Sequence, residues 1–158
     1  MRVAALVENT TIGKPYRKTH GLCLYIETAK HKILFDLGPD DSFIYNAEKM
    51  GIDIQEVDTV VISHGHVDHG GALGRLLKIN KKAKVFMHKA ALEPHYVKVA
   101  FARLSVGIDG GGAGDGRVVL TGSRFRLDDE ILLFADVEGQ FDSRSNRTLF
   151  AKTADGLV

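Results

Sequence analysis

The chain has few of the features that would mark it as secreted, membrane-bound or nucleic-acid-binding. Its single cysteine, Cys23, excludes an intrachain disulfide and fits a reducing compartment. No stretch approaches the ~20 apolar residues of a membrane span, and the apolar start at residues 3–7 is too short for a secretory signal. The 21 basic and 20 acidic residues are well mixed and give a net charge of +1. We therefore expect a cytoplasmic protein that binds neither nucleic acid nor membrane.

The length of 158 residues predicts one domain, residues 1–158. Apolar patterns predict strands at 3–7, 20–27, 32–36, 58–62, 84–87, 117–120, 124–127, 130–134 and 147–153, and helices at 41–50, 70–79 and 90–99. Residues 107–116 contain six glycines and predict a mobile loop. This loop lacks the lysine-serine ending of a phosphate-binding loop and precedes a strand rather than a helix.

The last residues carry an incomplete pattern. Asp155-Gly156 is a strong two-residue hairpin signal, yet only Leu157 and Val158 follow it. An unpaired strand edge of this kind is normally covered in a finished domain. We therefore expect the chain to be a fragment of a longer fold.

Histidine is concentrated in one place. Three of the seven histidines stand in the stretch His64-Gly65-His66-Val67-Asp68-His69, directly after the apolar run 60–62. Imidazole beside carboxylate suits zinc, iron or manganese rather than calcium. Side chains two apart on extended backbone point the same way, so His64 and His66 are expected to bind one ion together. The alternative is a surface cluster that binds nothing, but three histidines at one strand end favour a metal site.

This stretch resembles the signature His-x-His-x-Asp-His of the metallo-β-lactamase superfamily. Further segments resemble one branch, which includes the dihydropterin–ribofuranosylaminobenzene phosphate synthase-like proteins: Glu8-Asn9-Thr10, His20-Gly21-Leu22, residues 33–38 and Gly51-Ile52-Asp53. The match is close over residues 1–90 and loose from there to 158. The resemblance implies an α/β (α+β) fold, an αββα sandwich of two mixed sheets with helices outside, here incomplete at the C-terminus.

The resemblance also implies a site for two zinc ions, with iron or manganese as alternatives. His64 and His66 would bind the first ion, and Asp68 and His69 the second. Asp36 matches a position that orients a metal-binding histidine; a strand-ending or capping carboxylate is the other interpretation.

Two further histidines, His20 and His88, are candidates for the substrate pocket, although either could be an ordinary residue at a strand end. His31 and His95 are expected to be exposed and uninvolved. The family completes its site with a third histidine, a bridging aspartate and a final histidine downstream, but no histidine follows His95. Asp136 or Asp142 could supply a ligand, and nothing in their spacing supports this.

The function implied is that of a metal-dependent hydrolase, in which a metal-bound hydroxide attacks a phosphoester or similar electrophile and Asp68 is catalytic. A helix beginning at Gly70 would point its N-terminus at the site and favour a small anionic substrate. One alternative is a catalytically incomplete fragment or subunit that pairs with a second copy or with a complementing C-terminal fragment. Another is a structural metal module, against which the single cysteine argues.

Overall fold

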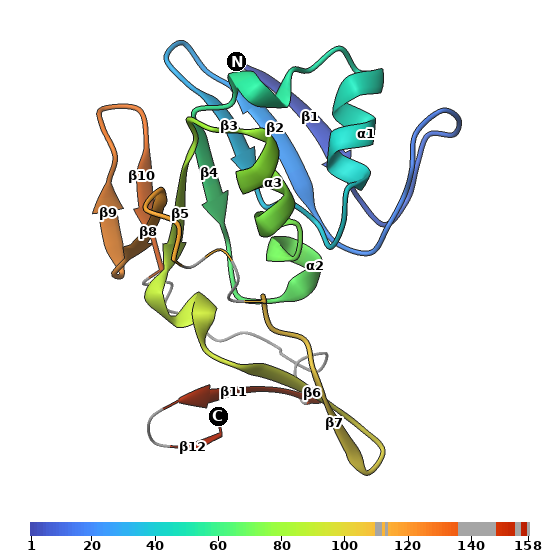
Figure 1. The fold of residues 1–158 in the computed structure, drawn as a ribbon, viewed down its shortest axis with the longest axis vertical. Coiled ribbons are helices and arrows are strands. Elements are labelled where there is room, and N and C mark those ends of the chain that lie inside the picture. Colours follow the sequence, from blue (N-terminus) through green and yellow to red (C-terminus); the bar gives the residue numbers. More distant parts are fainter. Residues whose placement is uncertain (110–111, 113, 136–147, 154–155, 158) are drawn as a thin grey trace.

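A six-stranded mixed sheet forms the centre of the protein, in a computed structural model that describes residues 1–109, 112, 114–135, 148–153 and 156–157 (Figure 1). The strand order is β1-β2-β3-β4-β5-β8. Their bounds are β1 Arg2–Val7, β2 Cys23–Glu27, β3 Lys32–Phe35, β4 Thr59–Ile62, β5 Lys84–His88 and β8 Val118–Thr121. Strands β3, β4, β5 and β8 run parallel, so their carboxyl ends meet at one edge of the sheet.

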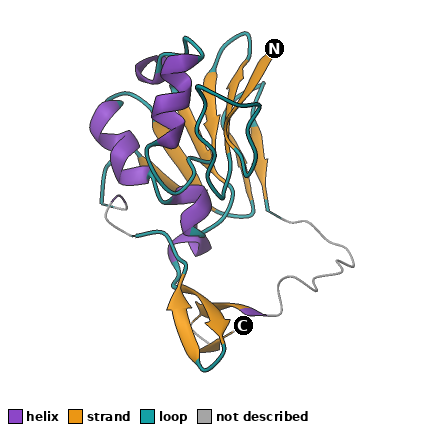
Figure 2. Ribbon diagram, turned by 90° about the vertical axis from the view of Figure 1, so that its right-hand side faces the viewer, coloured by secondary structure: helices purple, strands orange, loops and turns teal. Residues whose placement is uncertain are grey.

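Helices α1 (Ser42–Lys49) and α3 (Leu73–Ile79) cover one face of this sheet, as Figure 2 shows from the side. Phe43 on α1 and Leu76 on α3 are fully buried in the same core as Val60 of β4. Burial of each such side chain stabilises the fold by about 1.5–3 kcal/mol. Among the residues that the structure describes, no helix has both the length and the apolar character needed to cross a bilayer.

Two smaller sheets lie beside the central one. Strands β9 (Arg124–Arg126) and β10 (Leu132–Phe134) form a hairpin near the β5–β8 edge (Figure 1). The second small sheet has the order β12-β11-β6-β7 and projects from the main body (Figures 1 and 2). Its strands are β6 His95–Val99, β7 Ala102–Ser105, β11 Leu149–Thr153 and β12 Gly156–Leu157. The segment after β7 joins this sheet to the histidine motif through two backbone bonds, Val67 N to Val106 O at 2.8 Å and Ile108 N to Gly65 O at 3.0 Å.

The predicted helix at 90–99 is wrong. A 3₁₀ helix, η2 (Lys89–Leu92), ends before Pro94, and the chain then forms β6. Proline restricts the residue before it to extended backbone, and the valines of β6 favour a strand that has β7 and β11 as partners. Strand β7 was not predicted, because all four of its residues are exposed and show no buried–exposed alternation.

The predicted helix at 70–79 is present as α3 but begins at Leu73. A separate short helix, α2 (Val67–Gly70), precedes it, with Gly71 and Ala72 between them. The helix end nearest the histidine motif therefore belongs to a helix of four residues. Its dipole is too small to carry the anion site expected from a longer helix. Of the predicted glycine-rich loop, residues 110, 111 and 113 lie outside the described part of the chain.

Candidate metal centre

The four predicted ligands lie together where β4 ends and α2 begins. The centroid of the His64 ring is 4.7 Å from that of His66 and 4.2 Å from that of His69. The Asp68 carboxylate Oδ2 lies 3.5 Å from His69 Nε2. The short distance along the chain explains the cluster. His64 lies in the bend after β4, His66 has extended backbone just before α2, and Asp68 and His69 lie on the first turn of α2.

A buried carboxylate, Asp36, organises this cluster from below. Asp36 directly follows β3, is fully buried, and has a φ of 59°, a left-handed conformation that Asp and Asn adopt more readily than most residues. Its Oδ1 accepts a hydrogen bond from Ser63 N at 2.8 Å. Its Oδ2 accepts from Ser63 Oγ at 2.8 Å and from His69 Nδ1 at 2.7 Å. The hydrogen bond expected between Asp36 and a histidine of the motif is present, and its role in metal binding stays a prediction.

The same network assigns the tautomers of two histidines. Ser63 Oγ lies 2.9 Å from His64 Nδ1, and its only proton is donated to Asp36. The oxygen must therefore accept a hydrogen bond from the N–H group at His64 Nδ1. His64 and His69 then both carry a proton on Nδ1 in their neutral forms and leave Nε2 free to bind a cation. Sequence analysis missed the role of Ser63, although its position next to the motif was a usable signal.

Burial and neighbouring charges keep part of the cluster neutral. Although His64 is exposed as a residue, desolvation of its ring, followed by the neighbouring His69 and His66 imidazoles, lowers its pKa to about 4. Desolvation also lowers the pKa of His66, with His95 adding to the shift. The hydrogen bond to Asp36 instead raises the pKa of His69. Desolvation therefore favours the unprotonated forms of His64 and His66, which are the forms that bind a metal.

The donor set fits a first-row transition metal, but the donors converge only in pairs. His64 Nε2 and His66 Nδ1 face each other at 3.1 Å. Within the described ranges, no three His, Cys, Asp or Glu side chains are already arranged around one point as a metal needs. Asp136 and Asp142, the two candidates for a further ligand, lie outside the described residues.

The two candidate pocket histidines are not brought together. His20 Nε2 lies 3.3 Å from Asp68 Oδ2, and the two line a cavity of about 280 Å³. The other lining residues are His66, Val67, Val97, Val106 and Leu149. His88 instead accepts a hydrogen bond from Ala90 N at 3.2 Å and so caps η2. It lines a separate cavity of about 310 Å³ between the sheet and β10, which also includes Ser63.

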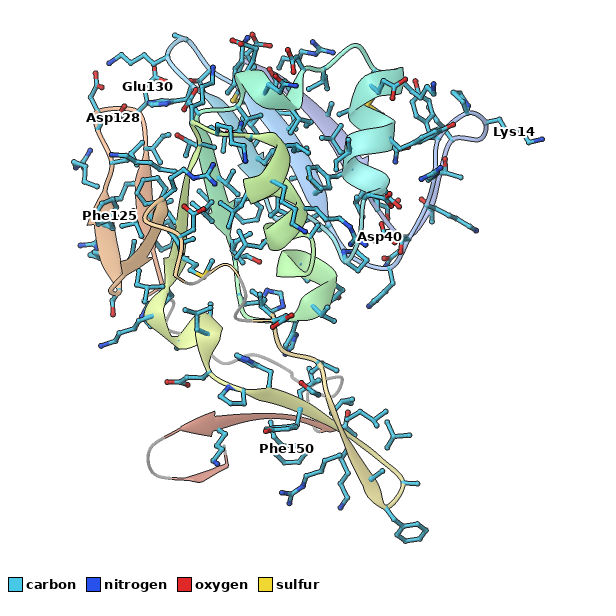
Figure 3. All side chains as sticks on the ribbon, in the orientation of Figure 1. Lys14, Asp40, Phe125, Asp128, Glu130 and Phe150 are labelled. Atoms are coloured by element: carbon cyan, nitrogen blue, oxygen red, sulfur yellow. The ribbon has the colours of Figure 1, made fainter. Side chains whose placement is uncertain are left out.

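His31 is not exposed, in contrast to the prediction. Its side chain is 16% exposed and lies between two carboxylates, with Nδ1 2.8 Å from Asp58 Oδ1 and Nε2 2.6 Å from Asp128 Oδ2. The hydrogen bond to Asp128, which has the larger effect, and the hydrogen bond to Asp58 raise the pKa of His31. Figure 3 shows Asp128 at the turn of the β9–β10 hairpin. His31 thus joins this hairpin to the β2–β3 turn, far from the histidine motif.

His95 is not exposed either, in contrast to the prediction. It is half-buried at the start of β6. The centroid of its ring lies 5.2 Å from that of His66, and the rings are perpendicular. Sequence analysis missed this contact because residues 90–99 were predicted to form a helix, whereas His95 begins a strand.

The chain is similar in sequence to known proteins. The sequence profile of the metallo-beta-lactamase superfamily matches residues 16–146. The chain is 33% identical over 96 residues to the 7,8-dihydropterin-6-methyl-4-(beta-D-ribofuranosyl)-aminobenzene-5'-phosphate synthase of Methanocaldococcus jannaschii, a match that covers 57% of this chain and 31% of that protein. An uncharacterized protein of the same organism, MJ0448, is 30% identical over 95 residues, or 60% of this chain and 37% of that one.

A solved structure has the same fold. Tm1679, described as a metal-dependent hydrolase of the beta-lactamase superfamily, superimposes with a TM-score of 0.75 at 23% identity and covers 99% of this chain. The match covers 56% of Tm1679, and the chain spans about a third of the length of the two curated relatives. The mixed sheets and outer helices confirm the predicted fold class.

Proposed function

Because the chain belongs to the metallo-beta-lactamase superfamily, we propose that it acts as a metal-dependent hydrolase whose centre is built from His64, His66, Asp68 and His69. The observation that carries this proposal is the network around Asp36. One buried carboxylate fixes the rings of His69 directly and of His64 through Ser63, so that both present an unprotonated Nε2. Such outer hydrogen bonds typically orient metal-binding histidines.

We propose zinc as the metal and two ions as the full complement, with iron or manganese as alternatives. Zinc, when bound, lowers the pKa of a water ligand from 15.7 towards about 7 and so supplies a nucleophile at neutral pH. The chain's own groups complete the chemistry. Asp68, whose side chain is 24% exposed, can hold an attacking water and accept its proton. The exposed His20 imidazole beside it can hydrogen-bond an anionic group of the substrate.

We propose a small anionic molecule as the substrate, with a phosphoester or similar electrophile as the reacting group. The archaeal relative is named for a 5'-phosphate compound, which supports a phosphate-bearing substrate. That relative is named as a synthase, so group transfer on such a compound is the second candidate reaction.

The alternative is a catalytically incomplete unit that needs a second copy or a complementing C-terminal segment. A catalytic zinc ordinarily has three protein ligands and water, whereas the motif offers two donors for each ion. The coverage of the relatives supports this alternative, because about two thirds of their length lies outside the match.

Turnover by the zinc-loaded chain tests the proposal. Phosphomonoester, phosphodiester and lactone substrates are offered to the wild type, to Asp68→Asn and to a control, Asp129→Asn, whose side chain is 74% exposed on the β9–β10 turn. We expect zinc-dependent turnover in the wild type and the control and its loss in Asp68→Asn. Equal turnover in all three proteins, or turnover that survives a chelator, would contradict the proposal. Zinc binding with background turnover throughout would favour the incomplete unit.

A further inference from the structure

A further cavity lies on the face of the central sheet that is turned away from α1 and α3 (Figure 2). Its volume is about 540 Å³, which is within the range of small-molecule sites. Thr59 and Lys84, the first residues of β4 and β5, line it, whereas the histidine motif follows the last residue of β4. The cavity therefore lies at the opposite end of these strands from the proposed metal centre.

The walls of this cavity are largely apolar. Phe86 of β5 and Val119 of β8 are direct neighbours in the sheet register and form the inner wall. Phe125 of β9 and Leu127, which follows β9, form the outer wall. The ring centroids of Phe86 and Phe125 are 5.5 Å apart, and Figure 3 shows Phe125 on the hairpin. Val119, Phe125 and Leu127 are only half-buried, so a ligand with an apolar body would remove them from water.

The β9–β10 hairpin, which carries the outer wall, is held at its turn by two charged contacts. Asp128 Oδ2 lies 2.6 Å from His31 Nε2, and Lys30 Nζ lies 2.6 Å from Asp129 Oδ2. Both contacts join the turn of the hairpin to the β2–β3 turn of the central sheet. The outer wall of the cavity is therefore anchored to the main body rather than left free.

The two carboxylates that line the cavity, Asp58 and Asp128, are already occupied by groups of the protein. Asp58 accepts hydrogen bonds from a backbone N–H group and from a threonine hydroxyl. Asp128 accepts hydrogen bonds from two backbone N–H groups. The His31 imidazole lies between the two carboxylates and contacts both. Neither acidic group therefore needs a ligand to satisfy it.

The two lysines that line the cavity, Lys82 and Lys84, keep hydrogen-bonding capacity for a ligand. Within the described ranges, Lys84 forms no ion pair. The Lys82 ammonium lies 3.5 Å from Glu56 Oε2. An ammonium group has three donors, so both side chains can donate to an acid group. Because the carboxylates are occupied and the ammonium groups are not, the cavity favours an anionic ligand over a cationic one.

We propose that this cavity binds a small aromatic anion, whose ring lies against Phe86 and Phe125 and whose acid group contacts Lys84. The site goes beyond the proposed function, because its lining residues all lie outside the histidine motif. An acid group would give the Lys84 ammonium a partner, and charge-assisted hydrogen bonds of this kind are the stronger ones. The aromatic ring would cover the half-buried apolar wall, and ring–ring contacts add to the gain from burial.

Calorimetric titration of the zinc-free full chain with benzoate tests this proposal. Benzyl alcohol has the same ring without the charge, and acetate has the same acid group without the ring. We compare the wild type with Lys84→Met, which keeps most of the side-chain length, and with Lys14→Met as a control in the loop between β1 and β2 (Figure 3). A hydrogen bond to a charged group typically changes affinity by about tenfold or more. We therefore expect Lys84→Met to bind benzoate at least about tenfold more weakly and benzyl alcohol unchanged, and the control to bind as the wild type does.

A second measurement locates the bound ring without a substitution in the cavity. In ¹³C-methyl-labelled wild type, benzoate should shift the methyl signals of Val119 and Leu127, and a His64→Ala His66→Ala variant should bind benzoate as the wild type does. Equal benzoate affinity in wild type and Lys84→Met, methyl signals that do not move, or binding that is lost with the two histidines would overturn the proposal. So would the absence of saturable benzoate binding. Each of these results leaves the proposed function standing, because that function depends on zinc and turnover at the other end of the strands.

Discussion

Substituting Asp36 by Asn tests how the histidine motif is oriented. Asn tolerates the left-handed backbone of Asp36 (φ 59°), so the change acts through the side chain. The amide oxygen of the substituted side chain would have to accept the hydrogen bond from the Ser63 backbone N–H group. The amide NH₂ group would then face Ser63 Oγ and His69 Nδ1, and both of these atoms donate hydrogen bonds to Asp36 in the wild type. His69 would have to present an unprotonated Nδ1 to this new donor and move its proton to Nε2, the atom needed for a metal.

The size of the effect follows from the bonds that are lost. Disturbing an outer-shell partner lowers metal affinity by about 10–100-fold, equivalent to about 1.4–2.8 kcal/mol. Two hydrogen bonds to a buried carboxylate are also lost, each contributing about 1.5–3 kcal/mol. We therefore expect Asp36→Asn to bind zinc at least about tenfold more weakly and to lose about 3 kcal/mol or more in free energy of unfolding.

Zinc calorimetry and urea denaturation of the metal-free protein measure the two effects separately. The matched control is Asp58→Asn, because Asp58 also accepts hydrogen bonds from a backbone N–H group and a histidine but lies at the other end of β4. The control should lose stability without losing zinc affinity. Zinc affinity of Asp36→Asn within about twofold of the wild type would refute the reasoning, because it would mean that the carboxylate does not set the histidine tautomers.

Three further predictions concern packing and pH. Gly65→Ala should lower the free energy of unfolding by about 1–3 kcal/mol, because the new Cβ would meet His95 and a backbone oxygen. Gly74→Ala, in α3 with open space around it, should raise the free energy of unfolding by up to about 1 kcal/mol. Equal unfolding free energies of the two variants in urea denaturation would contradict the packing argument. Asn80→Leu should lower the free energy of unfolding by more than about 3 kcal/mol, because the fully buried Asn80 side chain donates to two backbone carbonyls and accepts from two backbone N–H groups. A decrease below about 1 kcal/mol in the same assay would show that these backbone groups find other partners. The raised pKa of His31 means that the stabilisation it provides is fully present below about pH 6.5 and is lost as pH rises through its folded-state pKa. The Tm advantage of the wild type over His31→Gln should therefore shrink from about pH 6 to about pH 9. A difference in Tm that stays constant would contradict a protonated His31 between Asp58 and Asp128.

The parts of the site that could be predicted are those set by local geometry. Four candidate ligands fall within six residues at the end of an apolar strand, so they lie close together in almost any fold that makes residues 59–62 a strand. The parallel strands β4 and β5 were found because their apolar residues are continuous. Asp36 required the family resemblance, since 33 residues separate it from His69 and no local pattern joins them.

The parts that were missed depend on contacts that the sequence does not encode locally. The segment His95–Val99 has partners from β7 and β11, and Pro94 was assigned to a helix start when it in fact precedes a strand. That error removed His95 from consideration. His31 was expected to be exposed because its partner Asp128 stands 97 residues later on a different hairpin. In each case a tertiary contact, rather than propensity, decides the environment of the side chain.

Zinc content of the purified chain tests the central claim most directly. The wild type, a His64→Ala His66→Ala variant and a His31→Ala His88→Ala control are each dialysed against the same zinc buffer and analysed for metal. We predict bound zinc in the wild type and the control and its loss in the His64→Ala His66→Ala variant. Equal zinc in all three proteins, or none in any of them, would contradict the assignment of a metal centre to this motif.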